Sequence, residues 1–328
     1  MEQGTLGELY LTRSVTKHIR KHNKAVRIGA GVGKDYSLFK TEGECIISTE
    51  AVGESPYMAW VKALNNFYTS GGEIAGARVC YMLPTDIEES QLKTYAAEFN
   101  SLADQAGIQI IGGNTRVSRA YNKASFLVEV MGYVSEQQAL CHKAGSDYHI
   151  VMAGFTAVLG TNLIIDYKRE ELKSRFAESY IKEGEFPHEY SIRSMVDAIK
   201  PVLDEAGVVY MHDVSYGGVY GALWQLGEAL RLGINVDHRS IPIKQETIEI
   251  CNYFDLNPYM LEGTGALLMA ARDGEAIVDA MNMVGIKASV IGRMTQNKDR
   301  IVVLNSEGEK RFLSPVKGDE IYKVISAY

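Results

Sequence analysis

The sequence predicts an α+β protein built from two domains, residues 1–145 and 146–328. At 328 residues the chain is long for a single hydrophobic core, and two domains of roughly 150 residues are the usual outcome. Short apolar runs of strand character alternate with longer segments whose apolar residues recur every three or four positions, which indicates mixed sheet and helix. A polar, glycine-containing segment, His142 to Asp147, separates the two halves.

The first half begins with a predicted helix over residues 5–24, followed by a glycine-rich stretch before Asp35. A strand over Glu44 to Thr49 is expected to end at Glu50, and Pro56 then begins a helix with one apolar face. The other elements expected in this half are strand 77–83, helix 88–106, strand 108–111, a glycine turn over 112–116 and strand 125–134.

The second half is expected to begin with strand 148–153 and to continue as an α/β layer domain. Its later elements are predicted as helices 156–166, 168–183 and 190–205, strand 234–237, helix 244–254, a buried strand within 262–271, helix 273–284, strands 288–293 and 301–305, and a short terminal helix.

The central element of the second half is the stretch Val208 to Leu230. A strand over residues 208–211 is followed by His212 and Asp213, then by Gly217 and Gly218, which lead into a helix. A glycine turn at a helix amino-terminus favours a small-anion or nucleotide site, because backbone N–H groups and the helix dipole attract negative charge. The alternative is a tight strand-to-helix turn in which Asp213 only caps Ser215 or the glycine amides.

Composition limits the classes of partner. The net charge of −7 argues against general affinity for nucleic acid or for an anionic membrane. The four cysteines are scattered without a CxxC pair, so the sequence predicts neither a zinc site nor a disulfide framework. No apolar run reaches about 18 residues, and the amino-terminus lacks signal-peptide character. We therefore expect a cytoplasmic protein with no nucleic-acid or membrane partner.

The glycine-rich stretch does not match either common phosphate-binding motif. A P-loop needs Ser or Thr where this chain has Asp35, and the GxGxxG fingerprint fails because Gly29, Gly31 and Gly33 are two residues apart. These glycines are instead expected to let the backbone pass close to a phosphate or to a neighbouring strand. If Asp35, Glu50 and Asn114 converge, they could hold a metal–phosphate cluster, since Mg²⁺ takes hard oxygen ligands.

Eight segments, in this order, resemble a known superfamily over nearly the whole chain. They are GVGKDYSLF (31–39), IISTEAV (46–52), VKALNNFYTSGGEIAGARVCYMLP (61–84), IIGGNTRV (110–117), MHDVSYGGVYGALWQL (211–226), INVDHRSIPI (234–243), DLNPYMLEGTGALLMA (255–270) and VIGRMT (290–295). The superfamily is that of aminoimidazole ribonucleotide synthetase, hydrogenase maturation protein E, thiamine-phosphate kinase and selenophosphate synthetase. The chain most resembles its aminoimidazole-ribonucleotide-synthetase-related, hydrogenase maturation factor-like branch.

This resemblance implies a two-domain aminoimidazole-ribonucleotide-synthetase-like fold, with an amino-terminal sheet domain that forms a homodimer and binds ATP. It also implies that Mg²⁺ neutralises the triphosphate and that a phosphoryl group is transferred, which requires positioning and charge neutralisation more than covalent help. Asp213 is implied as the catalytic residue, and Asp35 and Glu50 as metal ligands. The implied nucleotide-binding residues are Gly31, Gly33, Lys34, Asp35, Asn66, Gly112, Gly113, Asn114, Thr115 and Arg116.

The chain departs from the family pattern where the family carries acidic residues. Asn66 and Asn114 are neutral at such positions, and Arg116 replaces a frequent Glu. Tyr216 replaces the Glu that is usual in the family's Thr-Glu-Gly-Gly turn. Because amide oxygens attract Mg²⁺ less than carboxylates do, the resemblance predicts weaker or less metal-dependent nucleotide binding. Arg116 could pair with a phosphate oxygen directly.

No single named activity of the superfamily fits the chain. It ends Ile325-Ser326-Ala327-Tyr328, without the carboxyl-terminal Cys that carries the acceptor thiol in hydrogenase maturation protein E. Two functions stay open. One is a homodimeric ATP-binding protein that transfers a phosphoryl group to an unidentified small molecule or maturation substrate. The other is a catalytically decayed relative that serves as a binding or scaffold dimer.

Overall fold

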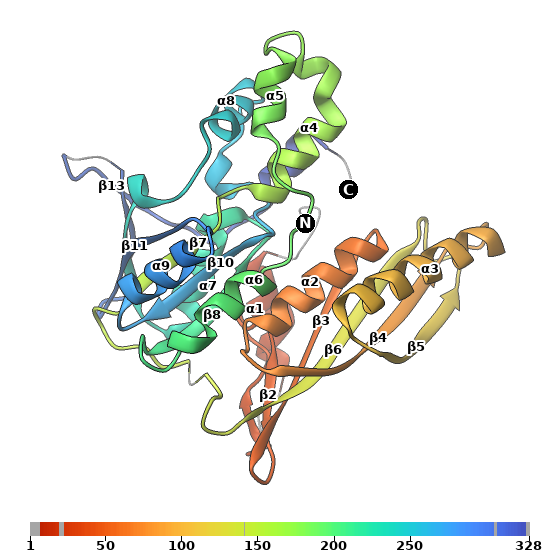
Figure 1. Cartoon of the computed structure of the whole chain (residues 1–328), viewed down its shortest axis with the longest axis horizontal. Coiled ribbons are helices and arrows are strands. Elements are labelled where there is room, and N and C mark those ends of the chain that lie inside the picture. The colour runs from red at the N-terminus through yellow and green to blue at the C-terminus, as the bar shows by residue number, and fades with distance from the viewer. Residues whose placement is uncertain (1–6, 20–22, 141, 305–306, 326–328) are drawn as a thin grey trace. The chain divides into compact units, whose positions relative to one another are not determined.

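The computed structural model describes residues 7–19, 23–140, 142–304 and 307–325, and the chain divides into two compact units (Figure 1). The amino-terminal unit comprises residues 21–29 and 34–139. The carboxyl-terminal unit comprises residues 1–20, 30–33 and 140–328. The segment 30–33 therefore belongs with the second half of the chain, although the sequence alone suggested one boundary near residue 145. The predicted α+β class is confirmed.

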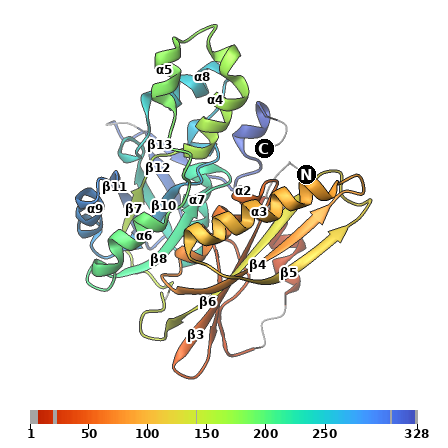
Figure 2. The ribbon, with the colours of Figure 1, turned by 45° about the vertical axis from the view of Figure 1, so that its right-hand side comes forward.

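The described part of the amino-terminal unit contains a six-stranded sheet in the order β1-β2-β3-β6-β4-β5. Only β4 and β5 pair in parallel; the other neighbours are antiparallel. Two helices, α2 (Pro56–Tyr68) and α3 (Glu89–Ala106), pack on the same face of the sheet, as Figure 2 shows. The strands are β1 (Val26–Ile28), β2 (Ser37–Lys40), β3 (Glu44–Gly53), β4 (Glu73–Leu83), β5 (Ile110–Val117) and β6 (Ser125–Ser135).

The two faces of this sheet differ in cover, because side chains alternate along each strand. In β3, Cys45 and Ile47 are fully buried against the helices, whereas Ile46 is 45% exposed and Val52 is 58% exposed. The edge-to-face contacts of Phe99 of α3 with Tyr81 and Phe126 hold α3 on the covered side. We call the side opposite α2 and α3 the open face.

The structure corrects several predicted boundaries. The β3 strand continues to Gly53, so Glu50 lies within a strand and not after it, because every residue from 44 to 53 pairs with β6. Residues 112–116 form part of β5 and not a turn, because they pair with β4. The expected helix 5–24 is shorter: α1 spans Glu8–Ser14 and η1 spans Thr16–His18. Residues 5, 6 and 20–22 of that prediction lie outside the described residues.

The described part of the carboxyl-terminal unit contains a seven-stranded sheet in the order β13-β12-β9-β11-β7-β10-β8. The strands are β7 (His149–Ala153), β8 (Val208–Val214), β9 (Gly233–Asp237), β10 (Ala266–Ala271), β11 (Ala288–Thr295), β12 (Arg300–Val303) and β13 (Lys310–Phe312). The α-helices are α4 (Val158–Leu172), α5 (Glu178–Gly184), α6 (Arg193–Ile199), α7 (Gly218–Leu230), α8 (Gln245–Tyr253) and α9 (Gly274–Met283). Short 3-10 helices are η2 (Lys200–Val202), η3 (His238–Ser240), η4 (Pro258–Met260) and η5 (Glu320–Lys323).

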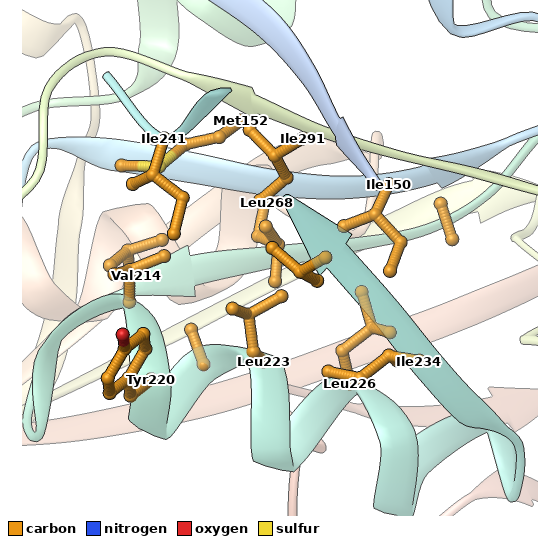
Figure 3. Close-up of a cluster of buried hydrophobic side chains, with 14 of the residues drawn as sticks. Ile150, Met152, Val214, Tyr220, Leu223, Leu226, Ile234, Ile241, Leu268 and Ile291 are labelled. Carbon is orange, nitrogen blue, oxygen red and sulfur yellow. The ribbon is translucent and has the colours of Figure 1, made fainter. Parts of the chain in front are cut away.

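The main core of this unit lies between α7 and the sheet (Figure 3). Tyr220, Leu223, Leu226 and Leu230 are all buried, which confirms the predicted apolar face of α7. The preceding strand, β8, is buried along all 7 residues and extends to Val214. His212 and Asp213 therefore lie inside the strand, which corrects the prediction that they follow it.

The predicted helices 168–183 and 190–205 are interrupted. The structure places α4 over Val158–Leu172, then the separate helix α5, and it ends α6 at Ile199 before the 3-10 turn η2 that contains Pro201. Proline cannot donate a backbone hydrogen bond, so the regular helix stops there. Within the described residues, no helix combines the length and the apolar character needed to span a bilayer.

Candidate functional site

The middle of β3 and the end of α2 bring three of the predicted site residues together. Ser55 caps α2 by accepting a hydrogen bond from the amide of Met58 at 3.2 Å, so the helix begins immediately after β3 and returns over it. Near the other end of α2, the Asn66 amide nitrogen donates to the backbone carbonyl of Glu50 at 3.5 Å. The Thr49 hydroxyl donates to the backbone carbonyl of Asp35 at 2.6 Å. The backbones of Asp35 and Glu50 and the side chain of Asn66 therefore lie in one small region.

The Glu50 side chain points to the open face, since its neighbour Thr49 is buried on the helix-covered face. Across the open face, Glu50 pairs with Glu129 of β6, which pairs with Arg78 of β4. Arg78 Nη1 lies 3.9 Å from Glu129 Oε2, and the Ser48 hydroxyl donates to Glu129 Oε1 at 3.3 Å. A polar strip therefore crosses the open face beside the apolar side chains of Ile46 and Val52.

Residues Asn114 and Arg116 lie on the edge strand β5, away from this region. They pair with Cys80 and Met82 of β4, which places both side chains on the open face. The strands β6 and β4 separate β5 from β3, and three strand spacings correspond to about 14 Å. Within one copy of the chain, the structure does not bring Asn114 next to Asp35 or Asn66.

The packing of β5 against β4 explains why one of the two glycines of β5, Gly113, has no side chain. A Cβ atom on Gly113 would lie 1.7 Å from the carbonyl oxygen of Val79, so only glycine allows β5 to approach β4 at this point. A Cβ atom on Gly112 would meet nothing closer than Arg78 Nε at 3.9 Å. Thr115 pairs with Tyr81 and therefore points to the helix-covered side. Sheet packing accounts for Gly113 without a nucleotide.

The glycine-rich stretch passes close to α7 within the carboxyl-terminal unit. Gly33 has a positive φ of 67°, and a Cβ atom there would lie 2.4 Å from the backbone oxygen of Gln225. The Tyr210 hydroxyl donates to the Gly33 carbonyl at 2.9 Å. Gly31 belongs to the same segment, whereas Lys34 begins the next part of the amino-terminal unit. At Gly33 the closest backbone approach is made by the helix α7, and the strand β8 contributes a side-chain hydrogen bond through Tyr210.

The glycine turn before α7 binds a carboxyl group, that of Asp319 from the same chain. Gly217 and Gly218 both have positive φ, and the Gly217 amide donates to Asp319 Oδ2 at 2.6 Å. The amides of Glu262 and Ile321 donate to Asp319 Oδ1 at 3.1 and 2.9 Å. The Gly217 amide is therefore held by Asp319, and not by Asp213 as the alternative reading of the turn expected. Asp213 is buried in β8, where it pairs with Leu267.

Asp319 and Glu262 form a buried acidic pair that the sequence did not reveal. Glu262 is fully buried and accepts hydrogen bonds from the amide and the hydroxyl of Thr264, at 3.2 and 2.6 Å. Burial and the neighbouring Glu262 carboxyl raise the pKa of Asp319 to about 7. Asp319 lies 102 residues after Gly217 and 57 residues after Glu262, and no local sequence motif connects these positions. The sequence therefore did not predict either contact.

His212 is buried and lies in a partly buried chain of polar side chains. Its Nε2 lies 2.6 Å from Gln225 Oε1, and the Gln225 amide nitrogen donates to Glu8 Oε1 at 3.1 Å. Glu8 also accepts the Val316 amide at 3.0 Å, and burial raises the pKa of its carboxyl. The contacts of His212 thus support a structural role more than that of a proton carrier.

The donor set does not fit a preformed magnesium site. Among the residues that the structure describes, no three His, Cys, Asp or Glu side chains come together as potential ligands of one ion. Glu50 points to the open face, and Asn66, where the family has an acid, uses its amide on a backbone carbonyl. We therefore derive no chemical step through a bound metal ion.

Two domain models of one family match the chain. The N-terminal domain of AIR (aminoimidazole ribonucleotide) synthase related proteins matches residues 33–134, and the C-terminal domain matches residues 168–305. The chain belongs to the AIR synthase related protein family. This finding confirms the resemblance inferred from the eight sequence segments.

Other AIR synthase related proteins align along most of the chain. Carbamoyl dehydratase HypE of Rhizobium leguminosarum bv. viciae is 22% identical over 310 residues, which are 89% of this chain and 86% of that protein. The solved HypE–HypF complex contains a chain with a TM-score of 0.73 and 17% identity, covering 94% of this chain and 98% of that chain. HypE in complex with ATP has a TM-score of 0.69 and 14% identity, covering 96% and 94%. At such identities the structural likeness establishes the fold alone.

Proposed function

We propose that this AIR synthase related protein is a homodimer that binds ATP through its amino-terminal unit. The observation that carries the proposal is the contact set at β3 and α2, where the backbones of Asp35 and Glu50 and the side chain of Asn66 lie close together. Structures of two relatives in the same fold family contain ATP or an ATP analogue, which supports a nucleotide as the ligand. The cytoplasmic location expected from the sequence stays a prediction.

The charges of the predicted nucleotide-binding residues, which include Asn114 and Arg116 on β5, favour binding with little help from metal. Asn66 and Asn114 carry no charge, whereas Arg116 is exposed on the open face and carries a guanidinium that matches phosphate oxygens. We propose that Arg116 takes over part of the charge neutralisation that carboxylate-bound Mg²⁺ supplies in phosphoryl transfer. Binding is then expected to depend on Mg²⁺ only weakly.

Thermal unfolding with and without ATP tests this proposal. ATP at about 100 times its dissociation constant is expected to stabilise the protein by roughly 2.7 kcal/mol. Asp35→Ala is expected to weaken ATP binding at least about tenfold, because the carboxylate can accept hydrogen bonds from the ribose hydroxyls, and a charged hydrogen-bonding group contributes roughly 1.5–3 kcal/mol. Each variant is compared with its own nucleotide-free baseline.

The matched control is Asp86→Ala, which removes an exposed carboxylate elsewhere in the amino-terminal unit. It is expected to leave the ATP-induced shift unchanged. No shift with ATP, with or without Mg²⁺, would contradict nucleotide binding. A normal shift in Asp35→Ala would remove that residue from the site.

The open face is the proposed dimer interface. Ile46, Val52 and Tyr133 are exposed on it, and a sheet with an apolar face is stable when a second layer covers that face. Val52→Glu places a charge among these side chains, which is expected to weaken dimerisation at least about tenfold through charge burial. Sedimentation velocity over a concentration series measures the change.

The control for the dimer prediction is Met283→Glu, on helix α9 of the carboxyl-terminal unit. Met283 is 89% exposed, so the control adds the same charge to another exposed apolar position. Monomeric wild-type protein at micromolar concentration, or equal effects of the two substitutions, would refute an interface on the open face.

The second candidate function is a binding or scaffold dimer without turnover. The lack of a three-ligand acidic cluster among the described residues favours it over phosphoryl transfer. The two candidates differ in whether ADP forms from bound ATP, which coupled assays detect in the presence of Mg²⁺. The solved HypE–HypF complex supports testing a maturation protein as the partner of such a dimer.

A further inference from the structure

A cavity of about 470 Å³ lies in the carboxyl-terminal unit, along residues 311–323 and beside α7 and η4. Its size is within the range of small-molecule sites, about 300–1,000 Å³. All of its lining residues belong to this unit, and none of them is among the residues proposed to bind ATP. Met260, Leu313 and Val316 supply an apolar part of its lining.

The aromatic part of the lining is held in place by a network of rings. Tyr220 is buried, stacks on Tyr259 with ring centroids 5.4 Å apart, and shares a hydrogen bond of 3.0 Å with His238 Nδ1. Burial raises the pKa of Tyr220 to about 12, so its hydroxyl is protonated at neutral pH. The ring of Tyr322 is a second aromatic lining group. At Tyr220 a planar ligand therefore meets an uncharged ring that is held in place.

The rim of the cavity carries positive charge that the surrounding acids do not neutralise. In the described part of the chain, neither Arg311 nor Lys317 lies within 4.0 Å of a carboxylate, and the Arg311 guanidinium is 5.8 Å from the Tyr220 ring centroid. Lys323 pairs with Glu320 at 2.6 Å. Asp319 directs its oxygens at three backbone amides. The local excess of positive charge contrasts with the net charge of −7 for the whole chain.

We propose that this cavity binds a small aromatic anion, with its ring beside Tyr220 and Tyr322 and its acidic group at Arg311 and Lys317. The ligand class is a single aromatic or heteroaromatic ring that carries a phosphate or a carboxylate. Rings supply apolar and stacking contacts, and guanidinium and ammonium groups pair with acidic oxygens. Tight binding is expected to require both the ring and the acidic group of the ligand, because each group alone makes only part of the contacts with the cavity.

Phenyl phosphate, benzyl alcohol and inorganic phosphate separate these requirements. Isothermal titration calorimetry on the full chain, without nucleotide, is expected to show phenyl phosphate binding at least about tenfold more tightly than either partial probe. Arg311→Gln and Lys317→Gln are each expected to weaken phenyl phosphate binding about tenfold or more. Tyr220→Phe keeps the ring and is expected to retain binding.

The matched controls are Arg293→Gln and Lys298→Gln, which remove exposed cations of the same unit outside the cavity lining. Their affinity for phenyl phosphate is expected to equal that of the wild type. Three outcomes overturn the proposal: no binding of phenyl phosphate at millimolar concentration, equal binding of inorganic phosphate, or equal losses in the control variants. Since the probes contain no nucleotide, these outcomes leave the proposal on ATP untouched.

Discussion

Replacement of Gly113 by alanine is expected to destabilise the amino-terminal unit by about 3 kcal/mol or more. The new Cβ atom would lie 1.7 Å from the Val79 carbonyl oxygen and 2.6 Å from its carbon, and both are backbone atoms of the neighbouring strand. Neither atom can rotate away, so β5 has to separate from β4. Hydrogen exchange of the amides in 73–83 and 110–117, together with urea unfolding, measures the loss.

Gly112→Ala is the matched control for this prediction. Gly112 has nearly the same positive φ as Gly113, 159° against 151°, but open space around its Cβ position. Its substitution is therefore expected to cost only the backbone strain, roughly 1–3 kcal/mol and less than Gly113→Ala. If both substitutions destabilise the unit equally, the close approach of β5 to Val79 is wrong. The same result would reopen a direct nucleotide role as the reason for Gly113.

Asp319→Ala is expected to destabilise the carboxyl-terminal unit by about 3 kcal/mol. The substitution leaves the amides of Gly217, Glu262 and Ile321 without their acceptor, and each buried unsatisfied donor costs roughly 1–3 kcal/mol. The effect is below the sum of three such terms because water can enter beside the neighbouring cavity, which Asp319 lines. Asp279→Ala, on the exposed side of α9, is the control and is expected to be nearly neutral.

The same residue determines a pH dependence with a defined sign. Burial and Glu262 raise the pKa of Asp319 from 3.8 to about 7, so between these values the folded state holds a proton that the unfolded state has lost. The stabilising contribution is complete below about pH 4 and is lost as the pH rises through about 7. From pH 5 to 7 the free energy of unfolding should fall by about 2 kcal/mol from this group.

Urea unfolding at several pH values checks this dependence by comparing wild type with Asp319→Asn. The comparison cancels the titration of other groups, so the variant is expected to show the flatter slope. Glu262→Gln is expected to reduce the slope as well, because it removes the neighbouring acid. A wild-type slope identical to that of Asp319→Asn would mean that Asp319 does not titrate in this range.

Several features were predictable because they depend on local pattern. The spacing of Tyr220, Leu223, Leu226 and Leu230 predicted the buried face of α7, since a helix repeats every 3.6 residues. Pro56 predicted the start of α2, since proline suits the first turn of a helix. The eight collinear segments led to the correct family, because they span both domains.

Strand ends were less predictable, and this affected the candidate site. Glu50 and Asn114 look like strand-end residues by composition, yet both are paired inside strands whose partners lie far away in the chain. Pairing between distant segments decides where a strand ends, and single-sequence patterns do not contain that information. The distance between β3 and β5 likewise depends on the strand order of the sheet.

By itself, the sequence determined the α+β class, the apolar face of α7 and the family, because periodicity and ordered motifs are properties of contiguous residues. Only the tertiary structure decided which groups meet. It placed Asp319 on the Gly217 amide, Gly33 against Gln225, and Asn114 three strands from β3. These contacts join residues that are tens to hundreds of positions apart, and the packing of the whole unit, not any local preference, selects them.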